Sequence, residues 1–275
     1  MGVRRAVDLA QAEQGSARVC TLGPLIHNPQ VLDYLTHRGV EILYEASLPE
    51  DLNGCTVIIR AHGISPQTEA QLHRLGANVI DATCPHVKAS QLKAQALAQA
   101  GFSLFLAGEE SHAEIIGIRG YAEQYCAPWC TVVGSAAQAA QAAAKFHAAN
   151  PRTALIGQTT ISAEEYQDIA EAIMRFFPSL EIAQTICTAT RERQDSLRDL
   201  LNKVDAVIIA GGKESANTRR LLTIAQAAGK PCALVETAAD IPPEFFNYHT
   251  IGLTAGASTP DFVIDSIEKT LASNP

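Results

Sequence analysis

Two cysteines stand in short polar loops where they could do chemistry. Cys84 lies in Asp81-Ala82-Thr83-Cys84-Pro85, and Cys187 opens the polar stretch that ends at Gln194. Thiolates and imidazoles at the ends of strands indicate a metal centre or an anion site. Iron–sulfur clusters are held mainly by cysteine thiolates, so two candidates leave such a ligand set short. An inert core thiol stays open as an alternative for Cys84.

Three histidines occupy equivalent places in the chain. His27, His62 and His112 each follow a short apolar run and a turn. One histidine in a loop is usually a surface or capping residue, but three in matching positions favour a shared ligand. Glu114 lies two residues after His112. It is either a surface carboxylate or a proton donor. To act as a general acid at neutral pH, its carboxyl would need a pKa raised by burial or by a neighbouring negative charge.

Later loops carry neutral hydrogen-bond donors. Ser215, Asn217 and Ser258 follow apolar runs, and each could be a helix cap or a ligand of phosphate. The spacing of Cys126 and Cys130 could bind a metal, but no second pair follows, which favours a structural role. The remaining three cysteines lie in strand-like apolar runs and are predicted to be core residues: Cys20, Cys55 and Cys232.

The elements that must position these residues share one layout, an apolar run followed by a polar turn and a helical pattern. Six apolar runs show it: 17–21, 57–60, 104–107, 154–157, 206–210 and 250–253. Helix starts are predicted at Asn28-Pro29, Ser65-Pro66 and Thr259-Pro260, which pair a capping side chain with a proline. Ser162 and Glu165 fit a capping box.

Alternation of strand and helix predicts an α/β fold with parallel sheets. Two further short strands are predicted at 41–44 and 78–81. Pairing the six units suggests three similar small α/β lobes with parallel-rich sheets around a central site. Their predicted spans are 1–85, 86–185 and 186–275, the last with a closing C-terminal helix.

Ligands of open α/β sheets bind beyond the carboxyl ends of the strands, where helix N-termini favour anions. Loops rich in His, Ser, Thr and Asn therefore predict a phosphorylated small molecule. The sequence contains no Walker motif and no Rossmann fingerprint, so a nucleotide is not the favoured ligand.

Composition excludes several classes of protein. The net charge of −8 argues against nonspecific binding of nucleic acid. No apolar run is long enough to predict a transmembrane helix, and no signal peptide is visible. Seven irregularly spaced cysteines do not resemble a disulfide framework. These features predict a protein of the reducing cytoplasm that binds neither membrane nor nucleic acid.

Taken together, the motifs resemble the LytB/IspH family of 4-hydroxy-3-methylbut-2-enyl diphosphate reductases. The resemblance covers essentially the whole chain. It rests on these segments, in order: His27-Asn28, Ala61-His62-Gly63, Asp81-Ala82-Thr83-Cys84-Pro85, Ser111-His112-x-Glu114, Gln158-Thr159-Thr160, Ile186-Cys187-x-Ala189-Thr190 with Arg193-Gln194, Gly212-Lys213-x-Ser215-x-Asn217, and Thr254-Ala255-Gly256-Ala257-Ser258.

The resemblance implies an oxidoreductase with a central [4Fe–4S] cluster that performs the last step of the non-mevalonate pathway of isoprene biosynthesis. The reaction removes the allylic hydroxyl and gives isopentenyl and dimethylallyl diphosphate. Ferredoxin or flavodoxin would deliver electrons singly. By motif, Cys84 and Cys187 are metal ligands, and Glu114, His112 and Thr159 are catalytic. The diphosphate would be held by His27, His62, His112, Ser215, Asn217 and Ser258.

Two departures from the family pattern have consequences. Ala216 stands where many relatives carry a second serine in the phosphate loop. The segment Met1–Ala6 matches the residues that come directly after the family's first cysteine, which lies in a Gly-Phe-Cys motif. The third cluster cysteine and the first strand of lobe 1 would then be absent. We interpret this as a shortened chain or a start codon assigned too far downstream, and expect the chain as written to hold a three-cysteine cluster poorly. A natural variant with an altered cluster is the alternative.

Two other functions remain open from the residues. One is a diphosphate-binding remnant of the family that holds no cluster. The other is a zinc hydrolase that uses Cys84, Cys187 and histidines, which would require three protein ligands and one open position.

Overall fold

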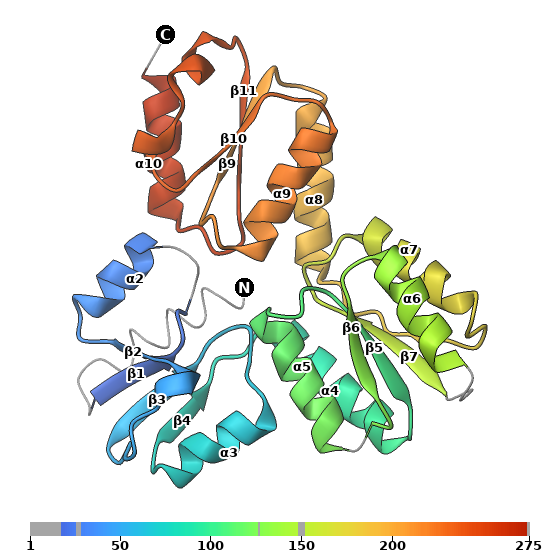
Figure 1. Ribbon diagram of the computed structural model, residues 1–275. Helices are drawn as coiled ribbons and strands as arrows, with labels where there is room; N and C mark the ends of the chain where they lie inside the picture. The colour runs from blue at the N-terminus through green and yellow to red at the C-terminus, as the bar shows by residue number, and fades with distance from the viewer. Residues whose placement is uncertain (1–17, 26–28, 126, 148–151, 274–275) are drawn as a thin grey trace.

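The computed structural model describes residues 18–25, 29–125, 127–147 and 152–273. It confirms the predicted α/β fold. The described residues form three sheets, each with its own helices, and the three lobes surround a common centre (Figure 1).

Lobe 1 contains a four-stranded sheet in the order β2-β1-β3-β4. Each neighbouring pair of strands is parallel. Its elements are β1 (Arg18–Leu22), α2 (Pro29–Thr36), β2 (Glu41–Leu43), the 3-10 helix η1 (Glu45–Ser47), β3 (Cys55–Ile59), α3 (Pro66–Arg74) and β4 (Asn78–Asp81).

Lobe 2 repeats this arrangement, with the parallel order β6-β5-β7-β8. Its elements are α4 (Pro85–Gln99), β5 (Ser103–Ala107), α5 (Ala113–Gln124), β6 (Cys130–Val133), α6 (Ala136–Phe146), β7 (Thr153–Gly157), α7 (Ala163–Met174) and β8 (Glu181–Ile182).

Lobe 3 has three parallel strands in the order β10-β9-β11. Its elements are α8 (Thr188–Leu201), β9 (Ala206–Ala210), α9 (Ala216–Ala227), β10 (Cys232–Val235), the 3-10 helices η3 (Ala238–Asp240) and η4 (Pro243–Asn247), β11 (Ile251–Ala255) and α10 (Asp261–Ala272). The three sheets lie inside the three predicted spans. The boundaries between lobes stay a prediction.

All three sheets wind in the same way. The first strand of each lobe lies between the second and the third, so the direction of winding reverses between the first and third strands. Such a reversal opens a crevice at the carboxyl ends of those two strands, where α/β proteins bind ligands. The six units predicted from sequence are the first and third strands of the three lobes.

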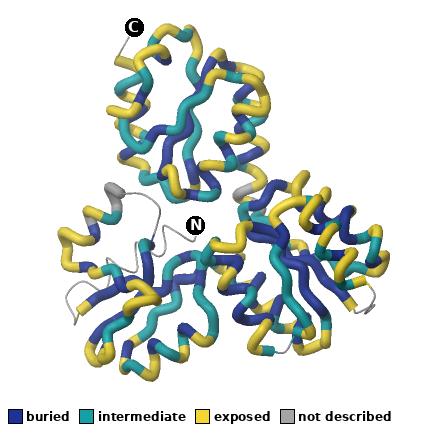
Figure 2. The backbone as a smooth tube through the Cα atoms, viewed as in Figure 1, coloured by how far each residue is buried: buried dark blue, intermediate teal, exposed yellow. Residues whose placement is uncertain are grey.

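The central strands are almost fully buried. β3, β5, β7 and β9 are buried at every residue, and helices with exposed outer faces cover them (Figure 2). Continuous Val, Ile, Leu and Ala runs are typical of parallel strands covered on both faces. No helix of the described residues combines the length and apolar character needed to cross a membrane.

Most predicted helix starts are confirmed, and one is wrong. Ser65 caps α3, and Ser162 and Glu165 form the capping box of α7. Thr259 does not cap α10, which begins at Asp261 with Pro260 as its N-cap residue. The Thr259 hydroxyl instead donates to the carbonyl oxygen of Ala210 at 2.9 Å, which ties this loop to the end of β9. Asn28 lies outside the described residues.

Glycines of α5 bring lobe 2 close to lobe 1. A Cβ on Gly120 would lie 2.5 Å from Cβ of Ser65, and one on Gly117 would lie 2.8 Å from Nε2 of Gln91. Gln91 is buried and donates to the carbonyl oxygen of Ile64 at 3.4 Å. The loop after β3 therefore packs directly against the helix that follows β5.

Candidate functional site

The candidate residues cluster by position in the three sheets. The loops after the first and third strands carry His62, His112, Thr159, Ser215 and Ser258, which places each at a reversal of winding. The two candidate metal ligands follow the fourth strands instead, Cys84 after β4 and Cys187 after β8. All these positions lie at carboxyl ends of parallel strands.

The loop around Cys84 is fixed by its own motif. The backbone N–H of Cys84 donates to the carbonyl oxygen of Ala61 at 2.9 Å, beside His62. Asp81 accepts from the backbone N–H of Thr83 at 2.9 Å and pairs with Lys88 at 3.0 Å. Burial opposes ionisation of Asp81, but these contacts outweigh it and lower the pKa of this carboxyl.

Two histidines from different lobes meet. The rings of His62 and His112 lie edge to face with their centroids 5.2 Å apart. His112 is the N-cap residue of α5, and its Nδ1 accepts from the backbone N–H of Glu114 at 3.2 Å. This contact requires Nδ1 to be unprotonated, so the neutral ring carries its proton on Nε2.

Glu114 is a buried carboxylate, with 1% of its surface exposed. The backbone N–H and the hydroxyl of Thr159 donate to its two oxygens, at 2.7 and 3.0 Å. Burial raises the pKa of Glu114 to about 7, although both bonds from Thr159 act to lower it. A carboxyl with this pKa can both give and take a proton near neutral pH.

This raised pKa gives a prediction for stability. Between its unfolded pKa near 4.5 and its folded pKa near 7, Glu114 keeps a proton in the folded chain that the unfolded chain has lost. Raising the pH through this window should therefore lower the free energy of unfolding, by on the order of 3 kcal/mol. In Glu114→Gln this loss disappears. Urea unfolding at about pH 5 and pH 8 measures the difference in free energy of unfolding between the variant and the parent. This difference should shift in favour of the variant at the higher pH. The same difference at both pH values would contradict the raised pKa of Glu114.

Thr159 connects this carboxylate to the second cysteine. The backbone N–H of Cys187 donates to the carbonyl oxygen of Thr159 at 3.1 Å. A continuous path of contacts therefore runs from the loop of Cys84 to Cys187, through both histidines, Glu114 and Thr159. Both cysteines are half-buried N-cap residues, of α4 and α8, and within the described structure neither sulfur caps its helix by a hydrogen bond. The helix N-termini favour negative charge at these sulfur atoms.

The start of α9 in lobe 3 contains polar atoms that lack partners. Ser215 caps the helix and accepts from the backbone N–H of Thr218 at 3.4 Å. Asn217 is 7% exposed, and among the described residues neither atom of its amide has a hydrogen-bond partner. The same holds for the buried hydroxyl of Thr218, which a Cβ on Gly211 would approach to 2.8 Å. Buried polar groups normally have partners, so this end of α9 is suited to an external acceptor and donor.

The path of contacts joins six of the predicted site residues, and Ser215, Asn217 and Ser258 lie apart from it in loops of lobe 3. His27 lies outside the described residues, and Ser258 is half-buried in the loop after β11. Thr218 was not predicted, because its place three residues after a capping serine suggests only local structure. Cys20 and Cys55 are core residues, as predicted, with their sulfur atoms 2.9 Å apart. Cys130 and Cys232 pack against core clusters, and Cys126 lies outside the described residues.

Comparison with known proteins gives consistent matches over nearly the whole chain. A family model described as LytB protein matches residues 1–272. A Treponema denticola protein named 4-hydroxy-3-methylbut-2-enyl diphosphate reductase is 44% identical over 98% of this chain and 94% of its own length. A protein of the same name from Aquifex aeolicus is 38% identical over 97% of this chain and 90% of its own length.

Two solved structures are also similar. One, described as (E)-4-hydroxy-3-methyl-but-2-enyl diphosphate reductase, the terminal enzyme of the non-mevalonate pathway, has a TM-score of 0.72 at 38% identity and covers 99% of this chain and 95% of that chain. The other is a Plasmodium falciparum reductase with a TM-score of 0.88 at 27% identity, covering 100% of this chain and 85% of that chain.

Proposed function

The chain belongs to the LytB family, and we propose that it reduces 4-hydroxy-3-methylbut-2-enyl diphosphate to isopentenyl and dimethylallyl diphosphate, the last step of the non-mevalonate pathway. It is an oxidoreductase. The reaction breaks one C–O bond, consumes two electrons and two protons, and releases water.

The observation that carries the proposal is the path of contacts across lobes 1 and 2. It brings a buried carboxylate with a pKa near 7 into one site with two histidines and places a cysteine at each end. A reductive dehydroxylation requires a proton donor, electron transfer and a hold on the anionic end of the substrate. Each of these tasks has candidate residues in or beside this site.

The diphosphate would be bound where neutral donors gather at helix N-termini. Ser215, Asn217 and Ser258 from lobe 3 would hold it together with His62 and His112. The unpartnered amide of Asn217 supports this role, because a phosphate oxygen would accept from its nitrogen. His27 is proposed as a further ligand on its sequence motif alone.

Glu114 would supply the proton at the hydroxyl end of the substrate. The hydroxyl of Thr159 donates to its carboxylate. Once the carboxyl is protonated, its O–H would donate to the Thr159 oxygen instead, and the hydroxyl would then pass its own proton to the leaving oxygen. His112 accepts from the backbone N–H of Glu114 in the first turn of α5. It would hold the diphosphate beside the Glu114–Thr159 pair. Thr159 would also orient the hydroxyl end of the substrate.

Cys84 and Cys187 are proposed as two of the ligands of an iron–sulfur cluster. Both sulfur atoms lie at helix N-termini, and in the described part of the chain neither is used as a helix cap. Such a cluster, proposed as [4Fe–4S], supplies single electrons and a Lewis-acidic iron. The proposed electron donor is ferredoxin or flavodoxin. Among the described residues no group of three His, Cys, Asp or Glu side chains is placed to hold one metal ion.

The proposal is tested by anaerobic turnover after reconstitution with iron and sulfide. We expect the chain to bind iron and sulfide below the stoichiometry of a full cluster, because it carries two candidate cluster cysteines, Cys84 and Cys187. We expect the substrate to be converted slowly to the two products with a one-electron dye as reductant. Cys84→Ser and Cys187→Ser should bring bound iron to background, whereas the matched Cys232→Ser should leave it unchanged.

Three results would separate the alternatives. Binding of diphosphate without iron, sulfide or reduction would identify a remnant that only binds the ligand. Stoichiometric zinc with hydrolysis of the substrate would identify a hydrolase. If the parent and both cysteine variants bound the same amount of iron, Cys84 and Cys187 would be excluded as cluster ligands.

A further inference from the structure

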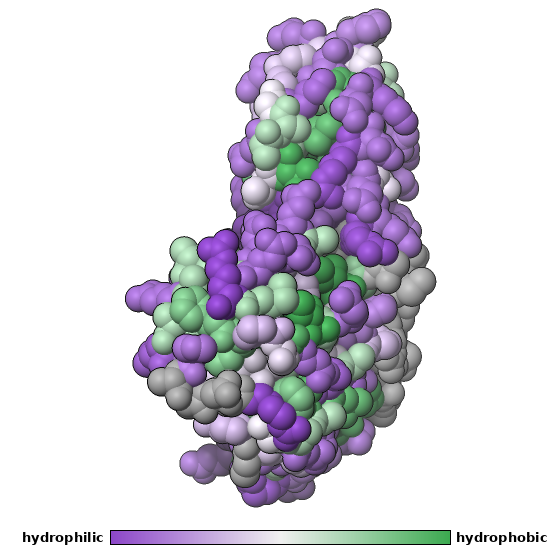
Figure 3. All heavy atoms as spheres, turned by 90° about the vertical axis from the view of Figure 1, so that its right-hand side faces the viewer, coloured by the Kyte–Doolittle hydropathy of each residue, from purple (hydrophilic) through white to green (hydrophobic). Residues whose placement is uncertain are grey.

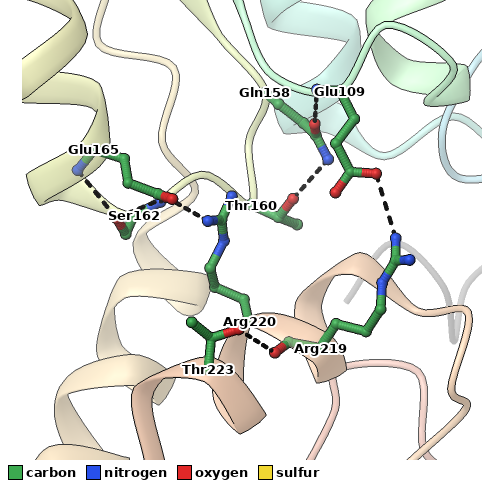
Figure 4. A network of polar contacts seen from close by, with 8 residues as sticks. All are labelled: Glu109, Gln158, Thr160, Ser162, Glu165, Arg219, Arg220 and Thr223. Atoms are coloured by element: carbon green, nitrogen blue, oxygen red, sulfur yellow. Dashed lines mark hydrogen bonds and ion pairs between the residues drawn. The ribbon is translucent and has the colours of Figure 1, made fainter. Parts of the chain in front are cut away.

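Two arginines of α9 lie one turn after its capping serine and reach across to lobe 2. Arg219 Nη2 lies 3.3 Å from Oε2 of Glu109, and Arg220 Nη1 pairs with Oε2 of Glu165 (Figure 4). The helix that carries the proposed diphosphate ligands Ser215 and Asn217 is therefore tied to another lobe.

The carboxylates at the other end lie beside the proposed catalytic residues. Glu109 follows β5 and belongs to the loop that leads to His112 and Glu114. Its backbone N–H donates to Oε1 of Gln158 at 3.2 Å, and Nε2 of Gln158 donates to Thr160 at 2.9 Å (Figure 4). One arginine thus contacts the point where the two catalytic loops of lobe 2 are joined.

The second pair uses the helix that follows the loop of Thr159. Glu165 accepts from the hydroxyl of Ser162 at 2.9 Å in the capping box of α7, and it also pairs with Arg220. A third ion pair between these two lobes joins Arg198 of α8 to Glu164 at 3.6 Å.

In each of the three ion pairs described between these lobes, the arginine belongs to lobe 3 and the carboxylate to lobe 2. Arg198 also pairs with Asp195 of its own helix at 2.9 Å. Mostly hydrophilic residues cross the waist between lobe 3, at the top of Figure 3, and lobe 2 below it. Domains that meet through a polar interface move relative to each other by default, and complementary charge pairs are one means of fixing their register.

We propose that Arg219 and Arg220 are positioning residues, which pair with Glu109 and Glu165 to set the diphosphate-binding end of α9 against the Glu114–Thr159 pair. This inference rests on the proposed function. The proposed ligands of the diphosphate come from lobe 3 (Ser215, Asn217 and Ser258) and from His62 and His112 of the other two lobes. A shift between lobes would therefore separate these ligands and weaken diphosphate binding.

The pair Arg219–Glu109 allows the sharper test. Glu165 also caps α7, whereas in the described structure the side chain of Glu109 caps no helix. Arg219 and Glu109 are both about half exposed, at 47% and 51%. The matched control is Arg18–Glu41, an ion pair inside lobe 1 with exposures of 48% and 51%.

The experiment measures binding of inorganic diphosphate to the full chain by calorimetry. We expect Arg219→Glu and Glu109→Arg each to weaken binding by about fivefold, within the range of exposed ion pairs. The double exchange should restore it to within about twofold. Glu109→Arg decides the matter, because it adds positive charge near an anion and would strengthen binding if only the electric field acted. At about 1 M salt the losses should shrink.

Glu41→Arg and Arg18→Glu should leave binding unchanged, with thermal midpoints checking that every variant is folded. An unchanged or higher affinity in Glu109→Arg would overturn the positioning role while leaving the proposed function intact. Absence of diphosphate binding in the parent chain would overturn both.

Discussion

Glu114→Gln should abolish reduction while binding of the diphosphate stays within about twofold of the parent. Glutamine keeps the size of the side chain but cannot donate a carboxyl proton, and general acid catalysis is worth about 10²–10⁴-fold in rate. Burial raises the pKa of this carboxyl to about 7, so it can hold the proton near neutral pH. Single-turnover kinetics with substrate at saturation would measure the loss in the chemical step.

The matched control is Glu110→Gln. Glu110 lies in the same loop, is exposed and pairs with Arg119 at 3.7 Å. The same substitution there should change neither binding nor rate. Loss of binding in Glu114→Gln with an unchanged rate at saturation would contradict the role of proton donor and make Glu114 a binding residue.

Asn217→Ala should weaken diphosphate binding and at the same time stabilise the free chain. In the described structure the amide is buried with both polar atoms unpartnered, which costs about 1–3 kcal/mol in the free protein. Removing it should raise the free energy of unfolding by about 1 kcal/mol. Loss of a hydrogen bond to a charged phosphate should lower affinity by roughly 10- to 100-fold. Urea unfolding and calorimetry with inorganic diphosphate measure the two effects.

Asn202→Ala provides the comparison in the same lobe. Its amide nitrogen donates to the carbonyl oxygen of Arg198 at 3.2 Å at the exposed end of α8. This substitution should leave diphosphate binding unchanged and should not stabilise the chain. If Asn217→Ala lowered stability and left affinity unchanged, the amide would be a structural group.

The sequence predicted the parts of the fold that rest on local patterns. Buried parallel strands such as β5 and β9 are continuous apolar runs, and helix starts such as Ser65-Pro66 carry their own capping signals. The strands β6 and β8 were not predicted, because they are short and half-buried and lack a distinct pattern. Thr259 was assigned to a cap, but its hydroxyl found a partner on β9, far away in the sequence.

The candidate site also contains residues that local sequence patterns predict and residues whose role depends on contacts distant in the sequence. The residues His62, His112 and Glu114 were predicted from the loops they occupy, and the structure places them in contact. Among the described residues the amide of Asn217 and the hydroxyl of Thr218 lack partners. The hydroxyl of Thr218 lies against the loops after β9 and β11, and no local sequence pattern encodes that packing. The pairing of Arg219 with Glu109 joins residues 110 positions apart, so it follows only from the placement of whole lobes.

The central claim is that residues from all three lobes act on one substrate, and a crystal structure of the anaerobic protein with 4-hydroxy-3-methylbut-2-enyl diphosphate tests it most directly. We predict diphosphate oxygens within hydrogen-bond distance of Ser215 and the Asn217 amide, with the hydroxyl end of the same molecule at Thr159 and Glu114. A diphosphate bound away from α9, or a hydroxyl end directed away from Glu114, would contradict the account.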